Sequence, residues 1–302
     1  IIQINNTPTQ QILPEEAATL MRGEPGTAVT VTVAREGQDP FDLTITREVI
    51  AITSVRSRVL EPGYVYLRIS QFRVNTASEL KEELEEIYAE GEDIKGIVMD
   101  LRNNPGGILQ ASVGVVDAFV SQGRIVYTEG RIEGNNMEFM ATSSTVDENV
   151  PLVVLINSGS ASASEIVAGA LKDHRRAVLL GTRSFGKGSV QTVIPVSGNS
   201  AMRLTTARYF TPSGTSIQGT GISPDIEVAL ARIETLDGGD TREEDLKGAL
   251  DNGKGDKDRG PAKTKKADVM PATDQSKIDY QLARALDLIR GVSIFTDVKS
   301  GS

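Results

Sequence analysis

Cysteine is absent from this 302-residue chain, and histidine occurs only once. Without cysteine, the chain can form neither disulfides nor thiolate metal sites. The one histidine, His174, lies among charged residues at the polar end of a predicted helix, where a solvated histidine is the ordinary occupant. A Ser-His-Asp triad would have to use this residue, so its position argues against that kind of hydrolase. We expect no cofactor and no metal ion.

Long apolar runs are missing as well. No segment approaches the roughly 18 consecutive apolar residues that a membrane-spanning helix requires. The net charge of −9 speaks against nucleic acid as a partner, because phosphate binding needs clustered lysine and arginine. What is present is an ordinary globular composition, 39% hydrophobic and 24% charged, in a chain long enough for one large domain or two smaller ones.

Residues 1–48 are predicted to form a small β-rich unit. The chain opens on a strand pattern without a start methionine, so we expect it to begin inside a domain. Pro14 suits the first turn of a short helix that ends near Arg22, and the segments 26–33 and 41–45 have the patterns of strands. The unit is too short for a self-sufficient β-rich core. Its order of helix and strands resembles the C-terminal half of a PDZ domain.

Strand and helix patterns then alternate through about residue 180, and β patterns follow. Strands are predicted at 63–72, 94–101, 124–128, 152–156, 177–180, 193–196 and 201–205, a hairpin within 129–150, and helices at 76–89, 108–120 and 165–171. This alternation predicts the fold class α/β (α+β), with a core sheet flanked by helices in one domain at 49–233.

The last seventy residues differ in character. Residues 234–273 are mostly charged or small and are predicted to form a flexible linker. Residues 274–302 contain an amphipathic helix at 278–289. Two interpretations of this helix stay open: it packs on its own domain, or it makes a contact in an oligomer.

The chemistry is concentrated in residues 157–191. A turn of small residues at 159–164 joins an apolar strand to a helix and presents three serine hydroxyls where neighbouring side chains leave room. Backbone N–H groups at the start of that helix are unpaired and suit a developing negative charge. Gly106 and Gly107, after another apolar strand, offer a further approachable amide. Ligands bind beyond such strand ends in open sheets flanked by helices.

A base for a serine nucleophile is available in Lys187, between Gly186 and Gly188. Burial beside Phe185 and Val190 would disfavour the charged ammonium. A neutral amine in that place could take the proton of a serine and return it to the leaving amine. We therefore favour a serine hydrolase with a lysine base, and a purely structural role for the serine turn remains the alternative.

The same region also matches the phosphate-binding pattern G-x-x-x-x-G-K at residues 181–187. That motif needs serine or threonine after the lysine and the N-terminus of a helix to hold the phosphate. Here Gly188 follows the lysine and the next segment has a β pattern. Both differences argue against a phosphate site.

Three motifs make the sequence similar to the C-terminal processing peptidases, also called tail-specific proteases. They are Asp-Leu-Arg-Asn-Asn-Pro-Gly-Gly at 100–107, Gly-Ser-Ala-Ser-Ala-Ser-Glu at 159–165 and Ser-Phe-Gly-Lys-Gly-Ser-Val-Gln at 184–191. The resemblance implies a Ser/Lys protease that processes or degrades proteins from near their C-termini. It places the nucleophile at Ser162, the base at Lys187 and a residue that orients the lysine at Gln191. The oxyanion hole falls on the amides of Gly107 and Ala163.

The resemblance also implies a setting for the protein. Its substrates would be proteins or peptides with exposed C-terminal tails, which a PDZ domain binds while gating the active site. Its location would be the bacterial periplasm or cell envelope. A homo-oligomer and an activating adaptor protein are further expectations. The alternative that is not an enzyme is a PDZ-type peptide-binding module with an inactive hydrolase-like core.

Overall fold

The computed structural model describes residues 1–49, 53–89, 91, 93–131, 136–196, 198, 200–231 and 279–300, with side chains to residue 294. The linker predicted at 234–273 lies outside these residues. The chain divides into two compact units, residues 1–52 and 53–302, close to the boundary expected at residue 48. Within the described part, no helix is long and apolar enough to cross a membrane.

The first unit is a four-stranded sheet in the order β2-β1-β3-β4 with one helix. Its elements are β1 (Gln3–Ile4), β2 (Thr7–Pro8), η1 (Thr9–Gln11), α1 (Pro14–Met21), β3 (Ala28–Arg35) and β4 (Gln38–Thr46). The core is small: Ile4, Val29 and Val31 are buried. Helix α1 begins at Pro14, as the sequence predicts, because proline is tolerated where a helix N–H has no partner.

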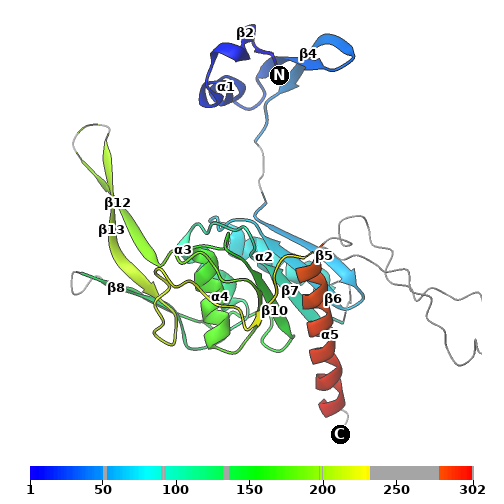
Figure 1. Ribbon diagram of the computed structural model, residues 1–302, viewed down its shortest axis with the longest axis vertical. Helices are drawn as coiled ribbons and strands as arrows, with labels where there is room; N and C mark the ends of the chain where they lie inside the picture. The colour runs from blue at the N-terminus through cyan, green and yellow to red at the C-terminus, as the bar shows by residue number, and fades with distance from the viewer. Residues whose placement is uncertain are drawn as a thin grey trace, which may run out of the picture. The chain divides into compact units, whose positions relative to one another are not determined.

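The second unit is built on a six-stranded sheet in the order β14-β11-β10-β7-β6-β5. Figure 1 labels four of these strands, β5, β6, β7 and β10. Its strands are β5 (Val55–Glu61), β6 (Tyr64–Ile69), β7 (Gly96–Asp100), β10 (Leu152–Ile156), β11 (Val178–Gly181) and β14 (Ile226–Glu227). Neighbouring strands run parallel except for the antiparallel pair of β5 and β6. The central strands are therefore joined by helical crossovers, as the alternating pattern predicted.

Helices cover both faces of this sheet. Helices α2 (Thr76–Ala89), α3 (Leu109–Asp117) and α4 (Ala163–Asp173) pack on one face, and α5 (Tyr280–Ser300) packs on the other. Strand β10 serves both cores: Val154 and Ile156 face the three helices, whereas Val153 and Leu155 face α5. Strands buried on both faces have continuous apolar sequences, which explains the unbroken run at 152–156.

Helix α5 lies against the sheet of its own domain, which is the first of the two interpretations of that segment. It buries Leu282, Ala285, Leu286 and Ile289. The approach is close at Gly96 of β7, where a Cβ atom would lie 2.6 Å from Cγ1 of Ile289. The helix continues to Ser300, well beyond the amphipathic pattern at 278–289.

A third sheet, in the order β12-β13-β8-β9, completes the second unit. Its strands are β8 (Arg124–Gly130), β9 (Glu138–Met140), β12 (Ser189–Pro195) and β13 (Ala201–Phe210). The hairpin expected within 129–150 is the antiparallel pair of β8 and β9, but β8 begins at Arg124. Strand β12 begins two residues after Lys187. The loop that carries Lys187, residues 182–188 (the lysine loop), therefore leads directly into this sheet.

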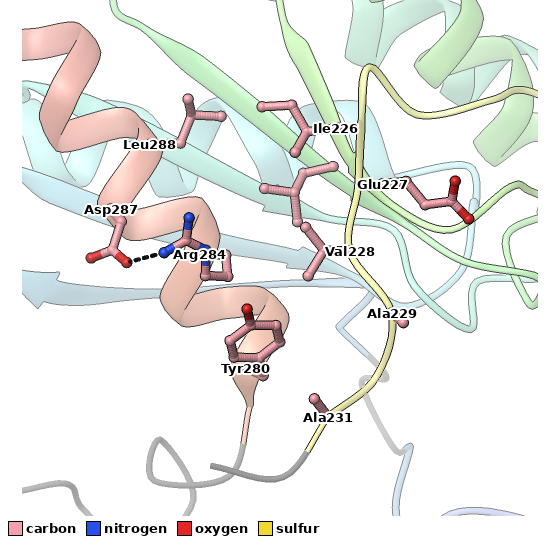
Figure 2. A pocket seen from close by; sticks show the side chains of 10 residues that line it. Ile226, Glu227, Val228, Ala229, Ala231, Tyr280, Arg284, Asp287 and Leu288 are labelled. Atoms are coloured by element: carbon pink, nitrogen blue, oxygen red, sulfur yellow. Dashed lines mark hydrogen bonds and ion pairs between the residues drawn. The ribbon is translucent and has the colours of Figure 1, made fainter.

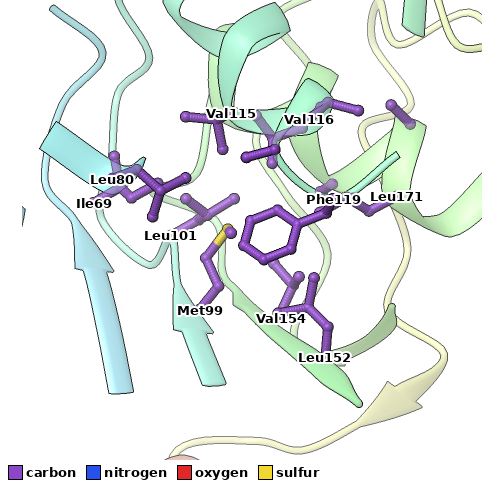
Figure 3. Packing of buried hydrophobic residues seen from close by; sticks show 14 of the residues in the cluster. Ile69, Leu80, Met99, Leu101, Val115, Val116, Phe119, Leu152, Val154 and Leu171 are labelled. Atoms are coloured by element: carbon purple, nitrogen blue, oxygen red, sulfur yellow. The ribbon is translucent and has the colours of Figure 1, made fainter. Parts of the chain in front are cut away.

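The side chain of Phe119 fills the space between α3, α4 and the sheet (Figure 3). It is fully buried, so Phe119→Ala removes its contacts and leaves a cavity. We expect a loss of about 3–5 kcal/mol in the free energy of unfolding, measured by denaturant titration. Phe185 is 67% exposed, and Phe185→Ala is the matched control with little expected loss. Equal losses in the two variants would contradict this account of the core.

Candidate active site

Three loops meet at the carboxyl ends of neighbouring parallel strands. Residues 102–108 follow β7, residues 157–162 follow β10, and residues 182–188 follow β11. Because β7, β10 and β11 are adjacent and parallel, their carboxyl ends lie along one edge of the sheet. The three motifs identified in the sequence are thereby brought together.

Ser162 occupies the turn between β10 and α4 in an unusual backbone conformation. Its φ of 56° and ψ of −112° are rare for a residue with a side chain, and such strain clusters at active sites. The neighbouring serines are fully buried: Ser160 donates its hydroxyl to the Leu101 carbonyl (2.8 Å) and Ser164 donates to the Asn104 carbonyl (2.9 Å). Ser162 is the one serine of the turn that is partly exposed.

The amides expected to form the oxyanion hole lie beside Ser162. A Cβ atom at Gly106 would lie 2.9 Å from Cβ of Ser162 and 3.0 Å from the Ala163 nitrogen, so only glycine permits this approach. Phe72 pairs with the loop on its other side, through its N–H to the Gly106 carbonyl and its carbonyl to the Ile108 N–H. Among the described residues, neither the Gly107 N–H nor the Ala163 N–H finds an acceptor. Two unpaired donors thus lie close to the serine.

Asn104, which is fully buried, holds the glycine loop at 106–107 in position. Its amide group donates to the Ile69 carbonyl (2.8 Å), and its Oδ1 accepts the Gly106 N–H (2.9 Å). Its backbone carbonyl accepts the Ala161 N–H (3.0 Å), as well as the Ser164 hydroxyl. The glycine loop and the serine turn are therefore fixed to each other through one residue.

The buried carboxylate of Glu165 connects the serine turn to the lysine loop. Its Oε1 accepts the Ser184 hydroxyl (2.5 Å) and the Gly186 N–H (2.6 Å). Its Oε2 accepts the Ser162 N–H (2.8 Å) and the Lys187 N–H (2.8 Å). The backbones of Ser162 and Lys187, 25 positions apart in sequence, are thus bound to the same oxygen atom.

Glu165 is absent from the site residues predicted above, although the sequence carries a signal for it. Serine followed three residues later by glutamate is the capping-box spacing, in which the glutamate reaches back to the N–H of the capping residue. Helix α4 begins in this way, with Ser162 as its N-cap. The remaining three donors come from the loop at 182–188, which only the folded chain brings to the carboxylate.

Lys187 departs from expectation. The sequence predicts burial beside Phe185 and Val190, but the side chain of Lys187 is exposed, as is that of Phe185. The backbone of the loop is fixed at Gly186 and Lys187, while the side chain of Lys187 is exposed to solvent. Gln191 lies on β12, is also exposed, and makes no hydrogen bond to Lys187 in the described part of the chain.

His174 is held far from Ser162, as the sequence suggested. It is the C-cap of α4, and eleven helical residues, spanning about 16 Å, separate it from the serine. Its Nε2 lies 2.7 Å from the Arg124 carbonyl, and its ring packs against Gly123. The geometry therefore excludes a triad of Ser162 with this histidine.

A hollow of about 490 Å³ lies elsewhere, between β14 and α5 (Figure 2). Its walls are largely aliphatic, and the charged pair of Arg284 and Asp287 lies at its rim. None of the three loops contributes to it, so it is not the candidate active site. Among the described residues, no group of three or more acidic or histidine side chains could hold a metal ion.

Comparison with known proteins identifies the family of the chain. The family model described as "Peptidase family S41" matches residues 63–228, more than half of the chain. The carboxy-terminal-processing protease of Bartonella bacilliformis is 47% identical over 91% of this chain, and the carboxyl-terminal-processing protease of Synechocystis is 39% identical over 74%. The chain belongs to peptidase family S41.

A solved structure supports the fold as well. The photosystem II D1 C-terminal processing protease is 33% identical, with a TM-score of 0.54 over 76% of this chain and 62% of its own. The chain spans 63% of the length of the Bartonella relative and 53% of the Synechocystis relative. The mixed α/β fold with its three sheets is thus similar to that of the photosystem II D1 C-terminal processing protease.

Glu165→Gln tests the connection between the two loops. The substitution keeps the shape of the side chain but places an NH₂ group where N–H and O–H donors converge, so at least one donor loses its acceptor. We expect the free energy of unfolding to fall by about 1.5–3 kcal/mol. Hydrogen exchange at residues 184–188 should also rise.

The matched control is Glu86→Gln, an exposed position on α2 that should change neither quantity. Unaltered exchange at residues 184–188 in folded Glu165→Gln protein would show that the carboxylate does not hold the lysine loop.

Proposed function

We propose that this protein is a serine endopeptidase that processes or degrades proteins from near their C-termini, with Ser162 as nucleophile and Lys187 as general base. One observation carries the proposal: the amides of Ser162 and Lys187 bind the same oxygen of Glu165. The backbones of the proposed nucleophile and the proposed base, which lie far apart in sequence, are thereby held close together. The activity of the S41 relatives named above supports the same conclusion.

The reaction follows from the placement of the groups. The neutral amine of Lys187 takes the proton of the Ser162 hydroxyl, and the oxygen attacks the carbonyl carbon of the substrate. The N–H groups of Gly107 and Ala163 stabilise the negative charge of the tetrahedral intermediate. The lysine then gives its proton to the leaving amine. Water then hydrolyses the acyl-enzyme: Lys187 takes a proton from the water and returns one to the Ser162 oxygen.

Because Lys187 is exposed, we propose that the bound substrate itself shields the amine from water. An amine can accept a proton from serine only in its neutral form. A polypeptide lying across the three loops would remove water from the amine and favour its neutral form. We propose that Gln191, at the start of β12, orients the lysine once the site is covered.

The remaining parts of the proposal concern partners and location. The first unit has the order of elements of the C-terminal half of a PDZ domain, and we propose that it binds substrate tails. The names of the relatives, which refer to carboxy-terminal processing, support substrates with exposed C-termini. We further propose a homo-oligomer and an activating adaptor, in the bacterial periplasm or cell envelope.

Ser162→Ala and Lys187→Ala should each lower the rate of cleavage of an unfolded protein by about 10⁴-fold or more, because each removes one half of the proton-transfer pair. Cleavage is followed by gel electrophoresis and mass spectrometry of the products. His174→Ala is the control and should retain full activity. Loss of activity in His174→Ala would restore a histidine mechanism, and full activity of Ser162→Ala would move the nucleophile to another residue.

The dependence of kcat/KM on pH tests the lysine base. Because the amine must lose its proton before it can accept one from Ser162, kcat/KM should rise with pH along an acid limb. A profile that stays flat between about pH 6 and pH 9 would contradict a lysine base. If the wild-type chain binds C-terminal peptides but cleaves none, the peptide-binding module with an inactive core is the correct alternative.

A further inference from the structure

A buried ion cluster joins the loop at 102–108 to helix α5. Arg102, the first residue of the loop, uses all five of its guanidinium N–H groups. It donates to Asp100 from Nε (3.0 Å) and Nη2 (2.6 Å), and to Asp279 from Nη1 (2.8 Å) and Nη2 (2.6 Å). The fifth donor, on Nη1, reaches Oε1 of Gln281 (2.9 Å). Such two-pronged contacts with carboxylates fix the orientation of an arginine as well as its position.

The charges of the cluster are balanced. Asp100 is fully buried and also accepts hydrogen bonds from Arg68 (3.0 Å) and from the hydroxyl of Tyr66 (2.8 Å). Two guanidinium groups therefore face two carboxylates. Burial alone would raise the pKa of Asp279, but the hydrogen bonds from Arg102 hold it below its ordinary value. Asp279 is thus charged when the cluster is formed.

Asp279 has a second role at the start of α5, the end of the helix that Tyr280 marks in Figure 2. Its Oδ1 accepts the Leu282 N–H (3.0 Å), and its carbonyl accepts the Ala283 N–H (3.0 Å), so it caps the helix. Gln281 ties the same turn to the chain after β14, through its amide and the Val228 carbonyl (2.7 Å). The position of the Asp279 carboxylate is therefore set by the docked helix.

The residues that follow Arg102 lead directly to Gly106 and Gly107. The Arg102 carbonyl accepts a hydrogen bond from Arg68 (3.1 Å), and the Asn103 N–H donates to Oδ1 of Asn157 (2.9 Å) in the serine loop. Asn104 then binds the Gly106 N–H. A shift of Arg102 would consequently pass through Asn103 and Asn104 to Gly106, the residue that lies against Ser162.

We propose that Asp279 is a positioning residue for the protease reaction: through Arg102 it holds the loop at 102–108 where the Gly107 N–H meets the oxyanion. The inference rests on the proposed function, since it assigns that loop to the oxyanion. It extends the catalytic machinery to α5, which lies on the opposite face of the sheet from α3 and α4.

Asp279→Asn is the variant that tests this role. Asparagine caps helices as well as aspartate does, so the start of α5 is preserved. One of its two side-chain acceptors becomes a donor, so the paired contact with Arg102 is lost. Asp287→Asn makes the same substitution at an exposed position of α5. Arg290→Gln loosens the docking of α5 at a different place, because Arg290 pairs with Glu61, which is not part of the Arg102 cluster.

In the full chain with a peptide substrate, we expect kcat of Asp279→Asn to fall by about 10²-fold, the effect of a displacement of about 1 Å in a catalytic group. KM should stay within about twofold, because ground-state contacts are retained. The affinity for a peptide boronic acid, which forms a tetrahedral adduct with the nucleophile, should fall by the same factor as kcat. Both control variants should keep wild-type kcat and boronate affinity.

Hydrogen exchange followed by mass spectrometry gives a readout independent of turnover. Peptides covering residues 102–108 should exchange faster in Asp279→Asn than in wild type, Asp287→Asn or Arg290→Gln. Unchanged exchange there in folded Asp279→Asn protein overturns the positioning role, whether or not the chain is active. An equal fall of kcat in Arg290→Gln also overturns it, because general docking of α5 would then be the cause. A third outcome is that the wild-type chain cleaves no substrate while residues 102–108 still exchange faster in Asp279→Asn. That result supports the positioning role and contradicts only the proposed function.

Discussion

The carboxylate of Glu165 is the group on which the arrangement of the site depends. A buried charge is costly unless hydrogen bonds replace the water that it loses, and this one accepts four of them. The donors belong to two different loops, so neither loop can move without leaving a charged oxygen unpaired. The stability of the fold is thereby linked to the closeness of Ser162 and Lys187.

Two further carboxylates fix the third loop, residues 102–108, through buried hydrogen bonds of the same kind. Asp100 and Asp279 hold Arg102 from two sides, and Asn104 carries that constraint to Gly106. All of these contacts fix backbone or buried side chains. The long side chain of Lys187 is left in solvent. The backbone around Ser162 and the loop at 102–108 is thus fixed, whereas the side chain of Lys187 makes no such contact among the described residues.

Much of the fold could be predicted from local patterns. The periodicity of apolar residues places α2 at Thr76–Ala89, as observed, and the apolar run at 152–156 is a strand buried on both faces. Strand β5 was missed because its sequence carries two arginines and lies at the edge of the sheet, where one side remains in water. The burial of Lys187 was predicted wrongly, since its apolar neighbour in sequence, Phe185, itself points outward.

The sequence alone determined the helices, the central strands and the three motifs, because each of these depends on residues within a few positions of one another. Only the tertiary structure decided which of three serines is accessible, which carboxylate joins the serine turn to the lysine loop, and where α5 docks. Those outcomes rest on contacts between residues about 20 to 180 positions apart, such as Ser184 with Glu165 and Arg102 with Asp279. A hydrogen bond of that kind leaves no periodic trace in the chain, because its geometry exists only after the strands have paired and the helices have packed.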